Sequence, residues 1–279
     1  MKKVLNLTLG SALGLSTVLA LTSCGSVSAS RKSLDFKEYI NVIDEDQFED
    51  ELEKVLDNIN VSNKSFIYER YEYNTYDESF NNNISTYLNY KYELFKLDFE
   101  NDIYSENAEE VYESNSLEGE SKSESKIKTQ TQKEEDIYYE YDLNSKSYST
   151  KSYDSIPDDF FKNFDGKYYG GYDFNFFDED KYYKDGDVFT ITYKIKDSKS
   201  TKDVYSDLNA KVQFYKDGDS FYGAYSLSYR YTENYDSATC VTNYFSEGFE
   251  KLELSDVTLK KLSKDDYKSL NISFSNSRY

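Results

Sequence analysis

The most regular pattern in the chain is a strict alternation of apolar and polar side chains in its second half. The clearest examples run from Phe189 to Ile195 and from Phe221 to Tyr231. Period-two alternation with one apolar face predicts antiparallel strands that are covered on one side. Weaker alternation predicts further strands at 66–73, 87–99, 137–143, 148–153, 210–215, 239–245 and 249–259.

Tight turns separate several of these stretches. Asp-Gly dipeptides at 165–166, 185–186 and 217–218 lie between aromatic segments, and such dipeptides favour two-residue hairpin turns. The expected strand at 87–99 is less regular, because its apolar residues change parity near Glu93. A bulge or strong bend there would return both sets to one face. We therefore expect hairpins at the three turns and an irregularity near Glu93.

Helical spacing of apolar residues is confined mainly to 33–59. Asp44, followed three residues later by Gln47, resembles a capping box that starts a helix. We expect an amphipathic helix, broken near Asp44, that covers one face of the sheet. Its two apolar faces comprise Phe36, Ile40 and Ile43, and Phe48, Leu52, Val55, Leu56 and Ile59.

Two shorter helices are also expected. Pro157 opens one at 158–164, because Pro is favoured in the first turn of a helix. Ser263 is a suitable N-cap for a second at 263–270.

Residues 113–132 contain almost no apolar side chain. We expect a mobile polar loop that becomes strand toward Lys126, with a long solvated hairpin arm as the alternative. Neither flank of this segment has an obvious core of its own. Residues 33–279 are therefore expected to form a single β-rich domain.

The N-terminus has the layout of a signal peptide. Lys2 and Lys3 precede an apolar stretch at 4–21 that ends in small residues, and such a segment is removed from the mature protein. As a permanent membrane span this stretch would be marginal, because polar residues dilute a run that is already near the lower length limit of about 17 residues. We therefore assign residues 1–23 to a signal peptide.

The end of this segment, Leu21-Thr22-Ser23-Cys24, resembles the lipobox of bacterial lipoproteins. The resemblance implies cleavage between Ser23 and Cys24 and attachment of a diacylglyceryl group to the Cys24 thiol. Two acyl chains anchor a protein stably, whereas one does not. The resemblance thus implies a lipid-anchored protein on the extracytoplasmic face of a bacterial cell membrane, with 24–32 as its tether. The alternative is an incidental Cys near the end of an ordinary secretory signal.

The composition is acidic and rich in Tyr. The chain has 33 Lys and Arg against 53 Asp and Glu; without residues 1–23, 31 basic residues remain and the net charge becomes −22. Nucleic acid repels such a surface, so we expect no nucleic-acid partner. The absence of His excludes imidazole catalysis and His-ligated metals. The 31 Tyr residues supply apolar area that tolerates partial exposure, which favours a folded β protein.

No motif in the chain indicates catalysis. G-x-S-x-G, P-loop and dinucleotide fingerprints are missing, so we expect no enzyme activity, cofactor or metal site. A hydrolase that uses paired carboxylates is one alternative. A calcium site formed by Asp178, Asp180, Asp185 and Asp187 is another. Cys240, the remaining Cys of the mature chain, lies in an expected strand, and we expect it to be buried.

Adjacent tyrosines are candidates for a recognition surface, because aromatic rings supply rigid contact area. In the competing interpretation one ring of each pair packs inside and the other shields the sheet, since adjacent strand residues face opposite ways. The candidates are Tyr138, Tyr139, Tyr168, Tyr169, Tyr172, Tyr182 and Tyr183.

The order of lipobox, short tether, amphipathic helix and many antiparallel strands resembles the LolA/LppX-like lipoproteins over most of residues 33–260. The resemblance implies an α+β fold that is mostly β: a strongly curved antiparallel sheet, or half-barrel, covered by an N-terminal helix. It also implies an apolar concavity that holds a lipid or another apolar ligand. The alternative is an adhesion or envelope-interaction module that presents Tyr-rich strands to envelope or host proteins.

Overall fold

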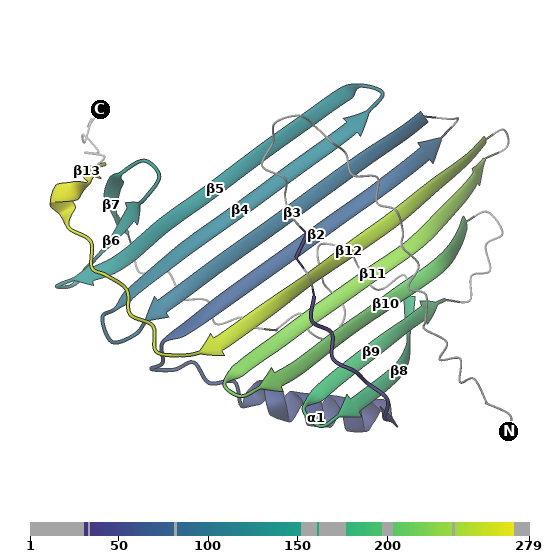
Figure 1. Cartoon of the computed structure of the whole chain (residues 1–279), viewed down its shortest axis with the longest axis horizontal. Coiled ribbons are helices and arrows are strands. Elements are labelled where there is room, and N and C mark those ends of the chain that lie inside the picture. The colour runs from purple at the N-terminus through teal and green to yellow at the C-terminus, as the bar shows by residue number, and fades with distance from the viewer. Residues whose placement is uncertain are drawn as a thin grey trace, which may run out of the picture. The chain divides into compact units, whose positions relative to one another are not determined.

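A computed structural model describes residues 31–32, 34–80, 83–151, 161, 177–196, 203–235 and 238–270. Within these residues, thirteen strands form one open sheet (Figure 1). The prediction of a mostly β protein with antiparallel strands is confirmed, with the parallel pair β7 and β13 as the exception. The described elements are β1 (Val42–Ile43), α1 (Glu45–Asp57), β2 (Phe66–Phe80), β3 (Asn83–Asp98), β4 (Ile103–Ser116), β5 (Gly119–Glu134), β6 (Ile137–Asp142), β7 (Ser147–Lys151), β8 (Phe177–Asp185), β9 (Val188–Ile195), β10 (Asp203–Asp217), β11 (Ser220–Tyr235), β12 (Ala238–Leu254), the short 3-10 helix η2 (Lys264–Asp266) and β13 (Lys268–Ser269).

The strand order joins two meanders in the middle of the sheet. The order is β1-β8-β9-β10-β11-β12-β2-β3-β4-β5-β6-β7-β13. Strands β2 to β7 follow one another, as do β8 to β12, and β12 lies beside β2. The pairing of β12 with β2 runs from Cys240 opposite Phe80 to Leu254 opposite Phe66. The centre of the sheet therefore depends on contacts between distant parts of the chain.

The pairing assigns each side chain to one of two faces, because successive residues of a strand point in opposite directions. The helix face is the side that carries Phe66, Phe189, Phe214, Tyr225 and Leu252. The strap face is the opposite side, which carries Tyr71, Gln132, Gln213 and Glu247.

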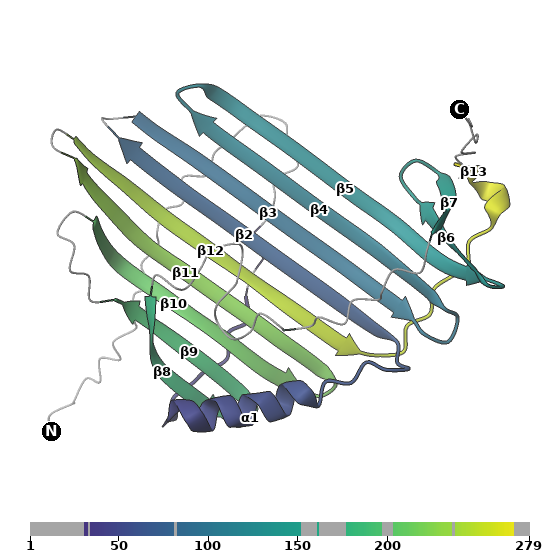
Figure 2. The same cartoon turned by 180° about the vertical axis from the view of Figure 1, so that it is seen from behind.

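The main apolar core lies on the helix face. The ring of Phe48 in α1 lies 5.7 Å from that of Phe189 and 5.2 Å from that of Tyr182. Phe161 packs on the same face, with its ring 5.4 Å from Phe214. Figure 2 shows α1 beside β8 and β9. Phe48 and Leu52 are the buried residues of the helix, so its apolar stripe is the part that contacts the sheet.

The start of α1 lies where the sequence predicts it. The Asp44 carboxylate accepts a hydrogen bond of 2.9 Å from the backbone N–H of Gln47, as an N-cap does. The predicted helical turn before Asp44 is wrong, because residues 34–41 form no helix. The ammonium of Lys211 lies 3.9 Å from the ring centre of Phe36. Contacts with the sheet therefore override the helical spacing in this segment.

Both ends of the described chain lie across the strap face. The N-terminal strap, residues 31–32 and 34–41, runs from β12 over β11 and β10 and leads into β1, which pairs with β8 (Figure 1). Residues 255–270, the C-terminal strap, run the other way and end in β13, which pairs with β7. Each strap thus begins near the middle of the sheet and supplies the two-residue strand that covers one edge.

The polar segment 113–132 forms the end of β4 and most of β5. It therefore takes the form of the alternative, a long hairpin arm, and not the expected loop. Residues 119–128 are exposed on both faces of β5, whereas Gln130 and Gln132 are buried. Ladder hydrogen bonds to β4 supply the order that apolar side chains do not provide.

Two of the predicted hairpins are confirmed, and the irregularity near Glu93 is wrong. Gly186 and Gly218 adopt φ of +63° and +60° in the β8–β9 and β10–β11 turns, a conformation that glycine adopts without steric cost. The pairing of β3 with β2 and β4 is continuous past Glu93. The apolar residues change parity because the first half of β3 packs on the strap face and the second half on the helix face. The turn at 165–166 and most of 158–164 lie outside the described residues.

The predicted helix at 263–270 is reduced to one short turn. The Ser263 hydroxyl accepts a hydrogen bond of 3.3 Å from the backbone N–H of Asp265, but η2 ends at Asp266. The backbone N–H groups of Lys268 and Leu270 donate to carbonyls of the β7 region at 2.9 and 2.8 Å. Pairing with the sheet edge therefore ends the helix.

Candidate functional site

A row of tyrosines crosses five adjacent strands on the helix face. Ring centres lie 5.6 Å apart for Tyr205 and Tyr229, 5.0 Å for Tyr229 and Tyr244, and 4.1 Å for the stacked pair Tyr76 and Tyr87. Tyr244 and Tyr76 are direct partners in the β12–β2 pairing. Cross-strand aromatic pairs of this kind stabilise a sheet and form a continuous amphipathic surface.

The neighbouring part of the helix face is apolar. Leu252 and Phe66 are completely buried, and Phe95, which stacks with Phe66 at 5.9 Å, is 8% exposed. They belong to the same core cluster as Phe48 of α1, and Val55 and Leu56 of α1 also pack against this cluster. The helix face thus combines this buried apolar core with an aromatic surface, which consists of the rings of the tyrosine row on strands β2, β3 and β10 to β12; four of these five rings are half-buried, and that of Tyr244 is buried.

A charged cluster interrupts this surface. The Arg70 guanidinium donates to the Glu72 carboxylate at 2.5 and 3.0 Å. Glu250 is only 7% exposed and accepts a hydrogen bond of 3.1 Å from the backbone N–H of Phe161. Burial raises the pKa of Glu250 above its usual value, although Arg70 acts in the opposite direction. Burial also raises the pKa of Tyr68, with the Glu250 charge as the second cause.

This cluster brings two carboxylates to one face, which is the first requirement of the hydrolase alternative. Glu72 already pairs with Arg70, and Glu250 already accepts from Phe161. The adjoining cavity has about 100 Å³ and is lined by Arg70, Glu72, Lys91 and Glu93. Its lining is entirely charged, so the cluster is better suited to a polar contact than to a buried apolar ligand.

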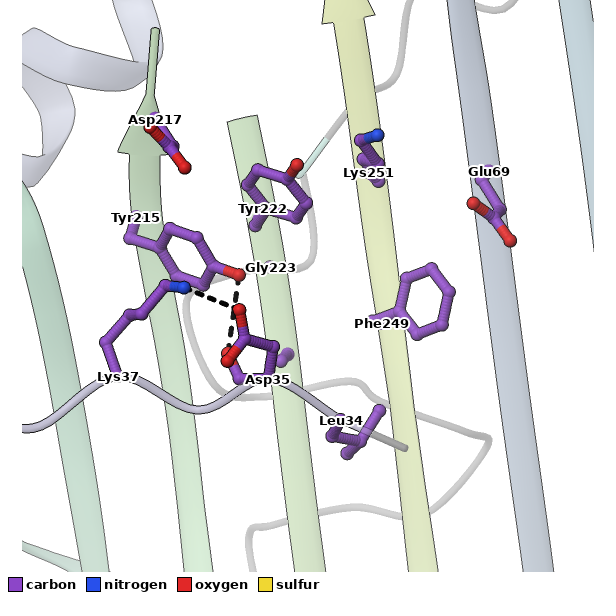
Figure 3. Close-up of a pocket in the computed structure, with 11 residues that line it drawn as sticks. Leu34, Asp35, Lys37, Glu69, Tyr215, Asp217, Tyr222, Gly223, Phe249 and Lys251 are labelled. Carbon is purple, nitrogen blue, oxygen red and sulfur yellow. Dashed lines mark hydrogen bonds and ion pairs between the residues drawn. The ribbon is translucent and has the colours of Figure 1, made fainter. Parts of the chain in front are cut away.

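A larger cavity of about 200 Å³ lies on the strap face, between the N-terminal strap and strands β10, β11, β12 and β2 (Figure 3). The rings of Tyr215 and Tyr222 stack at 4.7 Å along one wall. The Lys37 ammonium lies 2.5 Å from the Asp35 carboxylate, and the Tyr215 hydroxyl donates to the Asp35 carbonyl at 3.3 Å. The charged groups of the strap are therefore paired with each other, and the cavity beside them is small and is lined by both polar and apolar side chains.

The predicted tyrosine pairs are divided between the two faces. Tyr182 packs on Phe48, whereas Tyr183 contacts Tyr39 of the strap at 4.9 Å. Tyr138 lies near Asp102, and the Tyr139 ring lies 3.4 Å from the Lys264 ammonium. The rings of each pair thus lie on opposite faces, and Tyr182 packs against the apolar core as the competing interpretation expects. Tyr138 and Tyr139 are both half-buried, so inward packing of one ring is not confirmed for that pair. Tyr168, Tyr169 and Tyr172 lie outside the described residues, as do Leu21, Thr22, Ser23 and Cys24.

The acids proposed as calcium ligands have other partners. The carboxylates of Asp178 and Asp180 lie 3.8 Å from the ammonium groups of Lys196 and Lys194. The Asp185 carboxylate accepts hydrogen bonds from the backbone N–H groups of Ile40 and Asn41 at 2.7 and 3.2 Å. Among the described residues, no group of three or more acidic or Cys side chains is arranged to hold a metal ion.

Cys240 is half-buried and has a free thiol, which differs from the expected full burial. Burial raises the pKa of the thiol, and the nearby charges of Glu78 and Glu233 act in the same direction. A raised pKa lowers the fraction of reactive thiolate.

The comparisons with known proteins indicate neither a family nor a function for this chain. No protein-family model matches the chain, and no curated protein matches it either. In the described part of the chain, no helix has the length and apolar character needed to cross a membrane.

Sequence reasoning missed the glutamines that hold the straps. Gln213 and Gln132 are both 0% exposed, although Gln is usually a surface residue. The sequence does contain a signal for one of them, because Thr and Gln alternate from Thr129 to Gln132 with the period of two that is typical of a strand.

Proposed function

We propose that the protein is a bacterial lipoprotein, held on the extracytoplasmic face of the cell membrane by a lipid on Cys24, and that its helix face binds an apolar ligand without catalysis. The lipobox supports the anchor. The aromatic surface on β2, β3 and β10 to β12 is the observation that carries the ligand-binding function, because four of its five tyrosine rings are only half-buried although they adjoin the apolar core. A half-barrel curvature with α1 as a cover, as in the LolA/LppX-like lipoproteins, is part of this proposal.

The anchor is tested by mass spectrometry of the N-terminal peptide from the full-length protein. We expect a peptide that starts at Cys24 and carries a diacylglyceryl group, and we expect Cys24→Ser to abolish it. An N-terminus elsewhere, or an unmodified Cys24, would contradict the anchor.

The ligand is tested by native mass spectrometry of the full-length protein after gentle extraction. We expect one non-covalently bound lipid beside the covalent anchor. Tyr76→Ser and Tyr229→Ser, both in the tyrosine row, should lower its occupancy. The matched control is Tyr73→Ser, which changes a half-buried Tyr of β2 on the strap face. A folded protein that binds no lipid would rule out this function.

A second function is favoured by the exposed β4–β5 arm. Tyr112 and Ile127 are 39% and 45% exposed on the helix face, and Leu117 in the turn is 77% exposed. Exposed apolar side chains on a projecting hairpin suit an adhesion or envelope-interaction module. Alanine at these three positions should then reduce binding of cells to envelope or host proteins, while lipid occupancy stays unchanged.

A further inference from the structure

The chain enters the sheet at the middle of the strap face. The Arg31 guanidinium donates to both carboxylate oxygens of Glu247 at 2.5 and 2.7 Å, and it lies 4.4 Å from the ring centre of Phe245. Glu247 is only 3% exposed and is the tenth residue of the 17-residue strand β12. A bidentate ion pair with a buried partner fixes both position and direction.

The next residue is held as firmly. The backbone N–H of Lys32 donates to the Tyr71 hydroxyl at 3.0 Å, and its ammonium contacts Glu69 at 2.6 Å and lies 3.6 Å from the ring centre of Tyr92. These contacts place the start of the strap over β12, β2 and β3. Strand β12 is the sixth of the thirteen strands in sheet order, so this point is far from both edges.

The length of chain before Arg31 then limits where an anchor can lie. Cys24 precedes Arg31 by seven residues, which span at most about 23–25 Å when fully extended. A flexible chain of this length has an average span of only about 15 Å. From Glu247 the nearer end of β12 lies seven residues away, or about 23 Å along the strand. A lipid on Cys24 can therefore reach the rim of the sheet at most, and it cannot pass around to the helix face.

The charge of α1 disfavours the opposite orientation. Helix α1, which packs on the helix face, carries seven acidic residues and one Lys. Anionic lipid headgroups repel such a helix. The N-terminal strap has no such excess of acidic residues, because Arg31, Lys32 and Lys37 balance its Asp35 and Glu38.

From these observations we infer that the strap face is the membrane-facing surface of the protein, and that its partner is the surface of the bilayer into which the Cys24 lipid inserts. This inference rests on the proposed anchor at Cys24. It adds that the helix face, with its aromatic surface, is directed away from the membrane. Ligands and partners then approach the helix face from the aqueous side.

Two adjacent residues of β5 provide a matched test. Lys128 is exposed on the strap face and Ile127 on the helix face. The full-length lipoprotein with Cys240→Ser and either Lys128→Cys or Ile127→Cys is labelled with a fluorophore and placed in vesicles of phosphatidylcholine and phosphatidylglycerol that carry a quencher on the headgroups. We expect about twofold stronger quenching at Lys128→Cys, because the two labels lie on opposite sides of the sheet.

Two controls separate the ways in which the inference can fail. Insertion of twenty Gly and Ser residues before Arg31 should remove the difference, because a long flexible tether no longer limits orientation. If the labelled protein remains bound to vesicles but quenching is equal at the two positions, or stronger at Ile127→Cys, the orientation is wrong. If neither label is quenched and the protein stays in solution, the anchor itself is wrong, and the inference falls with it.

Discussion

Gln213 and Gln132 hold the two straps in the same way. The Gln213 side chain donates to the Lys37 carbonyl at 3.0 Å and accepts from the Lys37 N–H at 2.6 Å. Gln132 forms the same pair of bonds with Leu262, at 2.9 and 2.8 Å. A side-chain amide thus takes the place of a neighbouring peptide group, and it satisfies the backbone of a segment that crosses the strands.

Gln213→Leu tests this arrangement. The change removes the partner of the Lys37 N–H and carbonyl and of the buried Thr190 hydroxyl. A buried group that is left unsatisfied costs about 1–3 kcal/mol. We expect a loss of unfolding free energy in this range by urea denaturation. The control Gln47→Leu removes a Gln that is exposed on α1 and should change stability by less than about 0.5 kcal/mol. Equal effects of the two changes would contradict a special role for Gln213.

Asp98 couples the C-terminal strap to pH. It is 1% exposed and accepts hydrogen bonds from the backbone N–H of Leu259 at 2.8 Å and from Asn101. Burial acts to raise the pKa of Asp98, but these hydrogen bonds outweigh burial and hold the pKa below 3.8. The stabilisation is therefore present above the unfolded pKa of 3.8 and is lost as the pH falls through the lower folded pKa.

Asp98→Asn should remove this contribution. The variant should unfold at lower urea concentration than the wild type near neutral pH, and the difference should shrink as the pH is lowered toward about 3. Asp136→Asn, at an exposed turn position, serves as the control and should show no such trend. A difference that stays constant with pH would mean that the carboxylate charge of Asp98 is not the stabilising feature.

At the scale of elements, each strap ends as a cover for one sheet edge. An uncovered edge strand presents unpaired N–H and C=O groups and can pair with another molecule. On the β7 side, β13 supplies two backbone hydrogen bonds, from Lys268 to the Lys146 carbonyl and from Leu270 to the Tyr148 carbonyl. On the β8 side, β1 pairs through Val42 and Ile43.

Truncation of the C-terminal strap tests the edge cover. A chain that ends after Asp266 lacks β13, whereas one that ends after Leu270 retains it. We expect the shorter chain to self-associate at concentrations at which the longer chain remains monomeric, as measured by sedimentation velocity. If both chains have the same association state, the β7 edge does not need β13.

The elements differ in how far the sequence predicts them. The Asp185-Gly186 and Asp217-Gly218 hairpins and the N-cap at Asp44 are local features, and the structure contains all three. The straps are not local, because Gln213 and its partner Lys37 are 176 residues apart. The pattern of apolar residues in 34–41 reflects only local structure, and so it cannot reveal that this segment binds to Gln213. The exposed half of β5 has no apolar face, and so its sequence does not decide between a loop and a hairpin arm.

At the scale of the whole molecule, the two meanders meet along β2 and β12. Gly248 lies within β12 opposite Glu72 of β2 and Tyr225 of β11. A Cβ atom at Gly248 would overlap the Tyr225 ring and lie 2.6 Å from the Tyr71 carbonyl oxygen. The backbone oxygen cannot move without displacing β2, so the central pairing requires glycine here.

Gly248→Ala should therefore weaken the junction of the two meanders. We expect a loss of about 1–3 kcal/mol in unfolding free energy, the usual range for overpacking a core. Ser226→Ala, a half-buried position in the adjacent strand β11, is the control and should have a much smaller effect. A Gly248→Ala variant as stable as the wild type would show that β2 and β12 can accommodate a methyl group here without loss of stability.

Because β12 lies beside β2, the same arrangement of strands in the sheet could be formed by a chain that connects them in a different order. Leu254 and Phe66 are direct partners at the same end of the two strands, so a short loop could join them. A rearranged chain that starts at β8, joins β12 to β2 by such a loop in place of the straps and α1, and ends at β7 would then form every long strand pair through a local hairpin. Such a chain should fold faster, because low contact order speeds folding. It would also begin near the edge of the sheet, whereas the natural chain first contacts the sheet at its centre, where Arg31 pairs with Glu247 of β12.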